Sequence, residues 1–176
     1  MKHARTQLRT AVKDCLTAAD VAGGNVRTHT RGLGDDALPV VVIEPETENG
    51  IETKGPYPAP RVQVRPMSFS VAVYAKDVGV VRDADGNVTS VEKDADEAAD
   101  ELSAAVEAAL LSRTYRLMTK DSNGNPIKLG ERDLKLLGTG SVRDPITGER
   151  VYGAVHMLFE ATLLTEEGNP SNTINR

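Results

Sequence analysis

The sequence predicts an α+β fold: a mixed, largely antiparallel β-sheet with two amphipathic helices packed on one face, plus a protruding hairpin and long loops. Two segments carry apolar residues at helical spacing, and the segments between and after them alternate apolar and polar residues. This order of helix, strands, helix, strands is typical of an α+β domain. The 176 residues suit one domain, which we place at 1–165, followed by a polar, flexible tail at 166–176.

The first helix is expected from Arg5 to Ala19, ending before Gly23 and Gly24. Its apolar stripe consists of Leu8, Ala11, Val12, Cys15, Leu16 and Ala19. Because Cys15 lies inside the stripe, we expect a small buried side chain and not a reactive thiol.

Two short strands should follow, at Val26–Thr30 and at Val40–Ile43, which Pro39 introduces. The continuous apolar run of the second predicts a strand buried on both faces. The next stretch, Glu44–Pro60, holds four prolines and two glycines and has no period. It predicts a long exposed loop.

A long alternating strand is expected from Arg61 to Ala75, with Pro66 at a bulge or an edge position because proline cannot donate to the ladder. Val78–Val91 then predicts a protruding hairpin with Asp83–Asn87 at its tip. The tip residues do not have the register of a calcium loop, so we interpret them as a turn.

The second helix is predicted from Asp94 to Leu111, where Asp94 can cap the helix and Glu97 completes a capping box. Its stripe is rich in alanine, which allows a close approach to a sheet, and consists of Ala95, Ala98, Ala99, Leu102, Ala105, Val106, Ala109 and Leu110. A strand is then expected at Asp133–Val142 after a turn beginning at Asp121, and another turn at Arg143–Gly148. The last strand should place Val151, Gly153, Val155, Met157, Phe159, Ala161 and Leu163 on one face.

No motif indicates catalysis. The three histidines, His3, His29 and His156, fall on different predicted elements, and the chain has no CxxC pair. Leu137–Ser141 lacks the lysine and the third glycine that phosphate loops need. We therefore expect no enzymatic activity, no metal and no cofactor.

The amino-acid composition argues against several classes of binding partner. A net charge of −5 disfavours a surface that tracks phosphates, and the scarcity of aromatic residues disfavours stacking platforms for single strands. A single cysteine allows no internal disulfide, and no apolar run reaches the ~20 residues of a membrane span. With no signal peptide evident, we expect a soluble, intracellular protein that does not bind membranes.

The opening residues Met1–Leu16 resemble the start of the lambda-type minor tail protein U family, the phage tail terminators, in Met-Lys-His and in the Leu-Arg-x-Ala-Val core. The later order of predicted elements is also similar. The resemblance implies a structural virion protein: a ring, usually a homohexamer, that caps the tail tube, stops its polymerisation and receives the head-completion complex. It also implies a virion location at the head-proximal end of the tail, reached through the host cytoplasm during assembly.

Three segments depart from the compact family pattern: Glu44–Pro60, Val78–Val91 and Lys120–Glu131. Because irregular polar segments on a rigid sheet commonly carry recognition, we expect them to dock partners, namely other copies, the tube protein and the head-completion or stopper protein. The candidate interface residues are Glu48, Glu52, Lys54, Arg82, Asp83, Asp85, Asn123 and Arg143. Six copies would carry 6 × −5 = −30 charges, so genomic DNA should pass the lumen without specific binding.

Two alternatives stay open. A neck or head-completion subunit of the same assembly can use a similar small α/β domain. A small soluble enzyme with a site built from dispersed residues would show no sequence motif.

Overall fold

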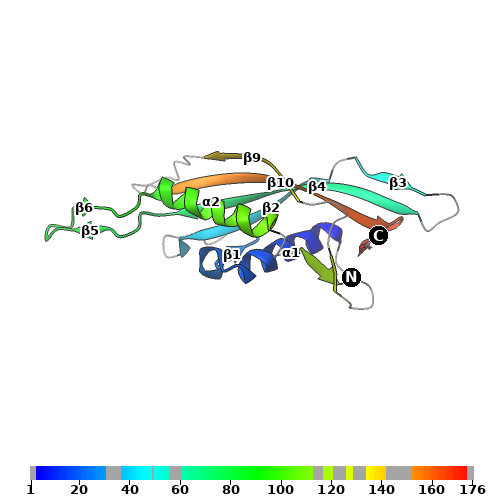
Figure 1. Cartoon of the computed structure of the whole chain (residues 1–176), viewed down its shortest axis with the longest axis horizontal. Coiled ribbons are helices and arrows are strands. Elements are labelled where there is room, and N and C mark those ends of the chain that lie inside the picture. The colour runs from blue at the N-terminus through cyan, green and yellow to red at the C-terminus, as the bar shows by residue number, and fades with distance from the viewer. Residues whose placement is uncertain are drawn as a thin grey trace.

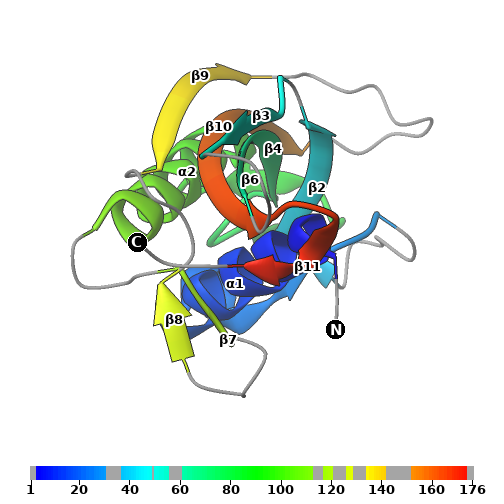
Figure 2. The same cartoon turned by 90° about the vertical axis from the view of Figure 1, so that its right-hand side faces the viewer.

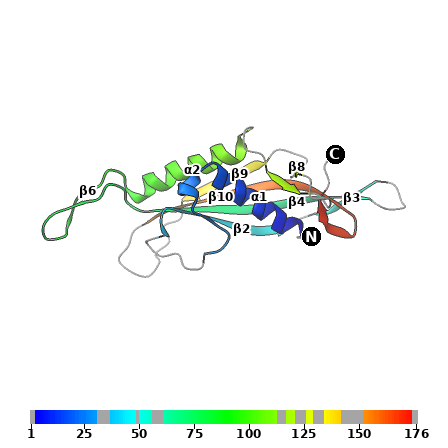
Figure 3. The same ribbon diagram turned by 90° about the horizontal axis from the view of Figure 1, so that it is seen from below.

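The computed structural model describes residues 3–30, 37–48, 50–55, 61–112, 117–120, 126–128, 134–141 and 152–173. Helices α1 (Ala4–Ala18) and α2 (Ala95–Leu111) cover one face of a seven-stranded sheet, and the molecule is elongated (Figures 1 and 3). All strand pairs of this sheet but one are antiparallel. The predicted α+β class is therefore confirmed.

Two 14-residue strands form the centre of the sheet, β4 (Val62–Ala75) and β10 (Gly153–Glu166), and pair over their whole length. On the far side of β4 lie β2 (Val40–Glu48) and β3 (Glu52–Lys54). On the far side of β10 lie β9 (Lys135–Ser141) and β11 (Asn169–Thr173). Figure 2, a view along the molecule, shows how strongly this sheet twists.

The remaining elements are short. β1 (Val26–Arg27) follows the 3₁₀ turn η1 (Val21–Gly24) and runs parallel to β2. Two small sheets stand apart from the main one: β5 (Val81–Arg82) pairs with β6 (Val88–Ser90), and β7 (Met118–Lys120) pairs with β8 (Pro126–Lys128). The expected strand at Val26–Thr30 is thus only two residues long.

Helix α1 forms where the apolar stripe predicts it and ends one residue earlier than expected. Asp20, with φ of 55°, takes the left-handed conformation that stops the helix before the two glycines are reached. Cys15 is buried, and its thiol donates a weak hydrogen bond to the carbonyl oxygen of Ala109 on α2, 3.8 Å away. The prediction that it packs as a small apolar residue is confirmed.

Burial raises the pKa of the Cys15 thiol, so the thiolate, which is the reactive form, is scarce in the folded chain. We expect a maleimide reagent at neutral pH to label the native protein far more slowly than the protein unfolded in guanidinium. Labelling at equal rates in the two conditions would contradict this burial. Since Cys15 is the single cysteine, the same reaction gives a readout of global unfolding for variants.

Helix α2 begins at the predicted cap, because the Asp94 carboxylate accepts a hydrogen bond of 2.8 Å from the backbone N–H of Glu97. Its first turn lies directly on the start of β10. A Cβ added to Gly153 would lie 2.0 Å from the carbonyl oxygen of Ala95. The predicted close approach of this helix to the sheet is confirmed, although Ala105, expected in the buried stripe, is exposed.

One core lies between the helices and the sheet. β10 contributes Val155, Met157, Phe159, Ala161 and Leu163, as its alternation predicts. Phe159 of β10 is paired in register with Phe69 of the neighbouring strand β4, and the rings of these two phenylalanines, the only ones in the chain, stack with centroids 5.4 Å apart. Val40–Ile43 of β2 is at most 1% exposed, which confirms a strand buried on both faces.

The loop predicted over Glu44–Pro60 is wrong for 44–48 and 52–54, which are strands β2 and β3. Pro45 is tolerated because the register of β2 against β4 shifts between Pro45 and Glu48, the kind of irregularity that accepts a residue without an N–H donor. Pro66 of β4 lies opposite the gap between β2, which ends against Met67, and β3, which begins against Val64. The expectation of a bulge or edge position for Pro66 is met.

The flexible tail expected from Glu166 also differs from the structure. β10 continues to Glu166, the chain turns at Gly168 with φ of 76°, and Asn169–Thr173 returns as strand β11. An ion pair supports the turn: the Arg61 guanidinium donates to Glu167 at 2.5 and 2.7 Å. The predicted turns at Asp121 and at Arg143–Gly148 lie outside the described residues.

Candidate functional site

The candidate interface residues lie in three different settings (Figure 1). Arg82, Asp83 and Asp85 are at the tip of the β5–β6 hairpin, which projects from one end of the molecule. Glu52 and Lys54 are on β3 at the opposite end. Glu48 lies inside the fold at the end of β2, and Asn123 and Arg143 lie outside the described residues. The candidate interface residues that the structure describes therefore do not form one surface.

The hairpin, which we call the arm and define as Val78–Val91, is a preformed element. Its tip is closed by the Asp83 carboxylate, which accepts hydrogen bonds from the backbone N–H groups of Asp85 at 3.0 Å and Asn87 at 2.8 Å. The bond from Asn87 is the main reason that the pKa of Asp83 is lowered. Gly86, with φ of 86°, completes the turn, which confirms the hairpin tip predicted from the sequence.

The arm is exposed along its length. Every residue from Val78 to Ser90 is solvent-exposed, and four of them are valines: Val78, Val80, Val81 and Val88, at 46, 37, 55 and 48%. Within the described chain its two strands pair only with each other. An isolated two-stranded hairpin is marginal in water, and clustered exposed apolar side chains commonly mark an interaction surface. The arm is thus the strongest candidate interface that the sequence predicted.

At the opposite end, strand β3 consists of polar residues. Glu52 and Lys54 of β3 are exposed and form a surface ion pair of 3.6 Å. Such a pair contributes little to stability, so both side chains are available for contacts outside the molecule. Their predicted exposure is confirmed, on a strand and not on a loop.

Glu48 does not belong to an exposed interface, which corrects its assignment. Its carboxylate accepts a charge-assisted hydrogen bond from the Arg65 guanidinium, and the two side chains are only 11% and 8% exposed. Arg65 also donates to the hydroxyl of Thr165 at 2.8 Å and to the side-chain oxygen of Gln63 at 2.6 Å. This network joins β2, β4 and β10, so Glu48 has a structural role.

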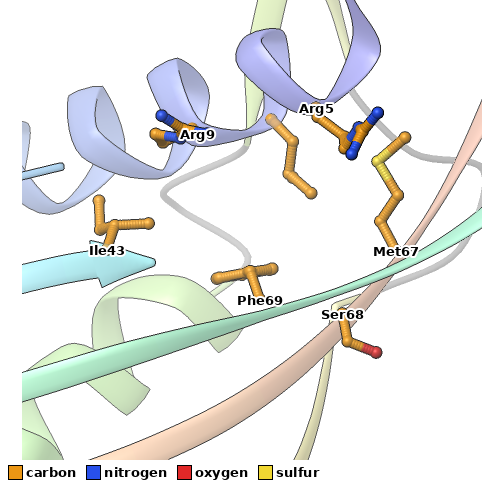
Figure 4. Close-up of a pocket in the computed structure, with 7 residues that line it drawn as sticks. Arg5, Arg9, Ile43, Met67, Ser68 and Phe69 are labelled. Carbon is orange, nitrogen blue, oxygen red and sulfur yellow. The ribbon is translucent and has the colours of Figure 1, made fainter. Parts of the chain in front are cut away.

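A hollow beside the first two turns of α1 was not predicted (Figure 4). Arg5 and Arg9 line it from the helix, while Ile43, Met67 and Phe69 line it from the sheet. The space between these side chains is about 280 Å³, most of it open to solvent, so the hollow is shallow. Its accessible lining is almost entirely apolar.

The two arginines beside the hollow, Arg5 and Arg9, differ in their partners. Arg5 lies 3.8 Å from the Glu48 carboxylate and is half exposed. The Nε atom of Arg9 is buried, and nothing in the described part of the chain accepts its hydrogen. A buried N–H without an acceptor costs free energy. The sequence places Arg5 and Arg9 four positions apart, so both lie on the same side of a helix. It does not show which sheet residues lie opposite them.

Two of the histidines, His3 and His156, make contacts within the fold. His3 caps α1, with its Nδ1 accepting from the backbone N–H of Arg5 at 3.2 Å. His156 lies on the face of β10 turned away from the helices, with its ring edge-on to Tyr74 at a centroid separation of 6.1 Å. Among the residues with described positions, no three His, Cys, Asp or Glu side chains gather as a metal site.

Leu137–Ser141 is part of the extended strand β9, so its glycines do not form a phosphate-binding turn. Among the described helices none has the length and apolar character needed to cross a bilayer. No protein-family model matches the chain, and no curated protein matches its sequence.

Proposed function

We propose that the chain is a structural, non-enzymatic subunit of a phage virion: a tail terminator that forms a ring of six copies on the head-proximal end of the tail tube. The observation that carries the proposal is the arm, a preformed hairpin that is exposed from Val78 to Ser90 and carries four exposed valines at one end of an elongated subunit. An assembly protein needs such projecting contacts, because its function is binding and not chemistry.

Two further features support it. The amino-terminal residues Met1–Leu16 resemble the tail terminator family. The polar β3 strand with Glu52 and Lys54 lies at the end opposite the arm, so the subunit has two separate surfaces for different partners. In this proposal they serve the tail tube protein and the head-completion protein, while DNA passes through the ring without specific contacts.

The test is to assemble tails with and without this protein and to measure tube length by electron microscopy. We expect overlong tubes in its absence and tubes of uniform length once the wild-type chain is restored. A variant lacking Gly79–Val88 should keep its fold and fail to restore uniform length. Tubes of normal length that fail only to join heads would favour the neck or head-completion alternative, and normal virions would contradict both.

A further inference from the structure

We infer that strand β9 of one copy accepts the arm of a second copy as an added β-strand, with the outer edge of β5 pairing along Gly138–Ser141. The inference rests on the proposed function in one respect. A ring of identical subunits needs a contact that joins one part of each copy to a different part of the next.

Strand β9 has an open edge. Its inner edge pairs with β10, and nothing in the described part of the chain pairs with its outer edge. Every residue of β9 except Leu136 is exposed, and Figures 1 and 2 show the strand at the border of the sheet. A register shift at Leu137 limits the regular open edge to Gly138–Ser141, which pairs without interruption with Val155–Leu158. The unpaired backbone N–H and C=O groups of such an edge form a template for another strand.

The other described edges of the main sheet are protected. β1 has two residues, and β3 has three, of which Glu52 and Lys54 are charged. β11 contains Pro170, which has no N–H to donate, and β2 carries Pro45 beyond the part that pairs with β1. Short length, charge and proline commonly keep an edge strand from pairing. In contrast, β9 has seven residues, no proline and one charged residue, Lys135 at its first position. It is therefore the edge best suited to accept a strand.

The arm has the matching property. Among the described residues β5 and β6 pair only with each other, so each keeps one unpaired edge. The register of β6 is interrupted by the extra residue Thr89, which leaves β5 as the more regular strand. A two-stranded hairpin is marginal in water and gains stability from a further strand. When a strand is added to an edge, its main-chain hydrogen bonds supply the affinity.

The side chains beside the two edges are compatible with this pairing. On β9, Leu137 is 50% exposed, and a Cβ added to Gly138 or Gly140 would meet no atom within 4 Å. A glycine inside a strand often marks a place where another backbone approaches closely. On the arm, Val80 and Val81 are 37% and 55% exposed. Pairing would therefore bury apolar surface on both copies.

The arm points away from β9 of its own copy (Figure 1). At its root, Val78 pairs with Lys93, which also donates to the Glu101 carboxylate at 2.6 Å. The Asp77 carboxylate accepts from the backbone N–H of Ala95 at 2.9 Å, which ties the start of the arm to α2. Because these contacts fix the direction of the arm, its pairing with β9 joins two copies head to tail. Such heterologous contacts close into rings or continue as filaments.

The experiment mixes two variants of the full chain, Val81→Cys in β5 and Thr139→Cys in β9, and treats them with a short bis-maleimide. Cross-linked dimers should form in the mixture and not with either variant alone, because each contact joins β5 of one copy to β9 of another. The native Cys15 is buried and reacts slowly. Thr53→Cys in β3 is the matched control for Thr139→Cys, since both are exposed threonines in edge strands. Mixed with Val81→Cys, it should give no dimer.

The same mixtures distinguish the other possible contacts. Dimers from Val81→Cys alone would show that arms meet arms, and dimers from Thr139→Cys alone would show that β9 meets β9. Either result would overturn the inference. A mixture that cross-links no better than the Thr53→Cys control would overturn it as well.

A second measurement is the dissociation constant for self-association, obtained by sedimentation against concentration. Thr139→Lys places a charged side chain on the open edge and should raise this constant roughly tenfold or more. Thr53→Lys makes the same change on β3 and should leave it nearly unchanged. Both threonines are exposed, so both variants should keep the fold, which Cys15 labelling checks. Equal effects of the two substitutions, or a chain that stays monomeric at every concentration, would contradict the inference.

The result separates this inference from the proposed function. If Thr139→Lys weakens binding to tail tubes and leaves self-association intact, β9 accepts a strand of the tube protein and the inference fails, while termination stands. If cross-linking follows the expected pattern and tube length does not depend on the protein, the contact is established and termination fails.

Discussion

Replacing Gly153 with alanine is expected to destabilise the protein by about 3 kcal/mol, at the upper end of the usual overpacking cost. The added Cβ would lie 2.0 Å from the carbonyl oxygen and 2.4 Å from the carbonyl carbon of Ala95, and 2.7 Å from the backbone nitrogen of Asp96. These are backbone atoms of the first turn of α2, so no side-chain rotation can relieve the clash. The helix must move off the sheet, and the contacts of Ala99 with the core weaken with it.

The measurement is thermal unfolding, in which this change should lower Tm by roughly 6–12 °C for a chain of this size. Gly138→Ala is the control, because Gly138 also lies in a strand of the main sheet and a Cβ there meets nothing within 4 Å. That variant should be neutral or slightly more stable, since alanine loses less conformational entropy on folding. Equal effects of the two substitutions would show that α2 does not lie as close to β10 as described.

Replacing Arg65 with alanine is expected to cost about 3 kcal/mol, the lower end of the range for breaking a buried ion pair. The loss leaves the Glu48 carboxylate largely buried, and among the described residues only Arg5, 3.8 Å away, then remains as a cation beside it. It also removes the hydrogen bond to the hydroxyl of Thr165, a residue with no exposed surface. Guanidinium unfolding followed by Cys15 labelling measures the change.

Two comparisons make this prediction specific. Arg5→Ala removes the other cation near Glu48, but Arg5 is half exposed, so its loss should cost no more than about 1 kcal/mol. Replacing both buried partners, Arg65→Met with Glu48→Gln, should recover most of the lost stability because no buried charge is left unpaired. A double variant as unstable as Arg65→Ala would contradict the assignment of the cost to the Glu48 carboxylate.

The elements that the sequence predicts well are those governed by neighbouring residues. The cap of α2 depends on Asp94 and Glu97, three positions apart, and the hairpin tip depends on Asp83 and Gly86. The alternation that places Phe159 in the core is likewise readable within β10. Local hydrogen bonds and strict periodicity leave such segments few alternatives.

The elements that were missed depend on distant parts of the chain. Asn169–Thr173 has no apolar pattern and is a strand because its backbone pairs with β10. Glu48 looks like an exposed acid, and its burial requires Arg65, 17 residues away, and the register that brings Thr165 beside Arg65. The hollow needs α1 to pack beside β2 and β4. The arm was predictable because it contacts little beyond itself.

The pairing of β4 with β10 has a mechanical consequence. The 14 residues of β10 that pair with β4 extend about 46 Å at roughly 3.3 Å per residue. They run along the long axis that separates the arm from β3 (Figure 1). A pulling force applied between these two ends would act along the strands, so that the cross-strand hydrogen bonds share the load in shear instead of opening one after another. In a force experiment the subunit should therefore resist stretching along its length far better than peeling of β10 from one end.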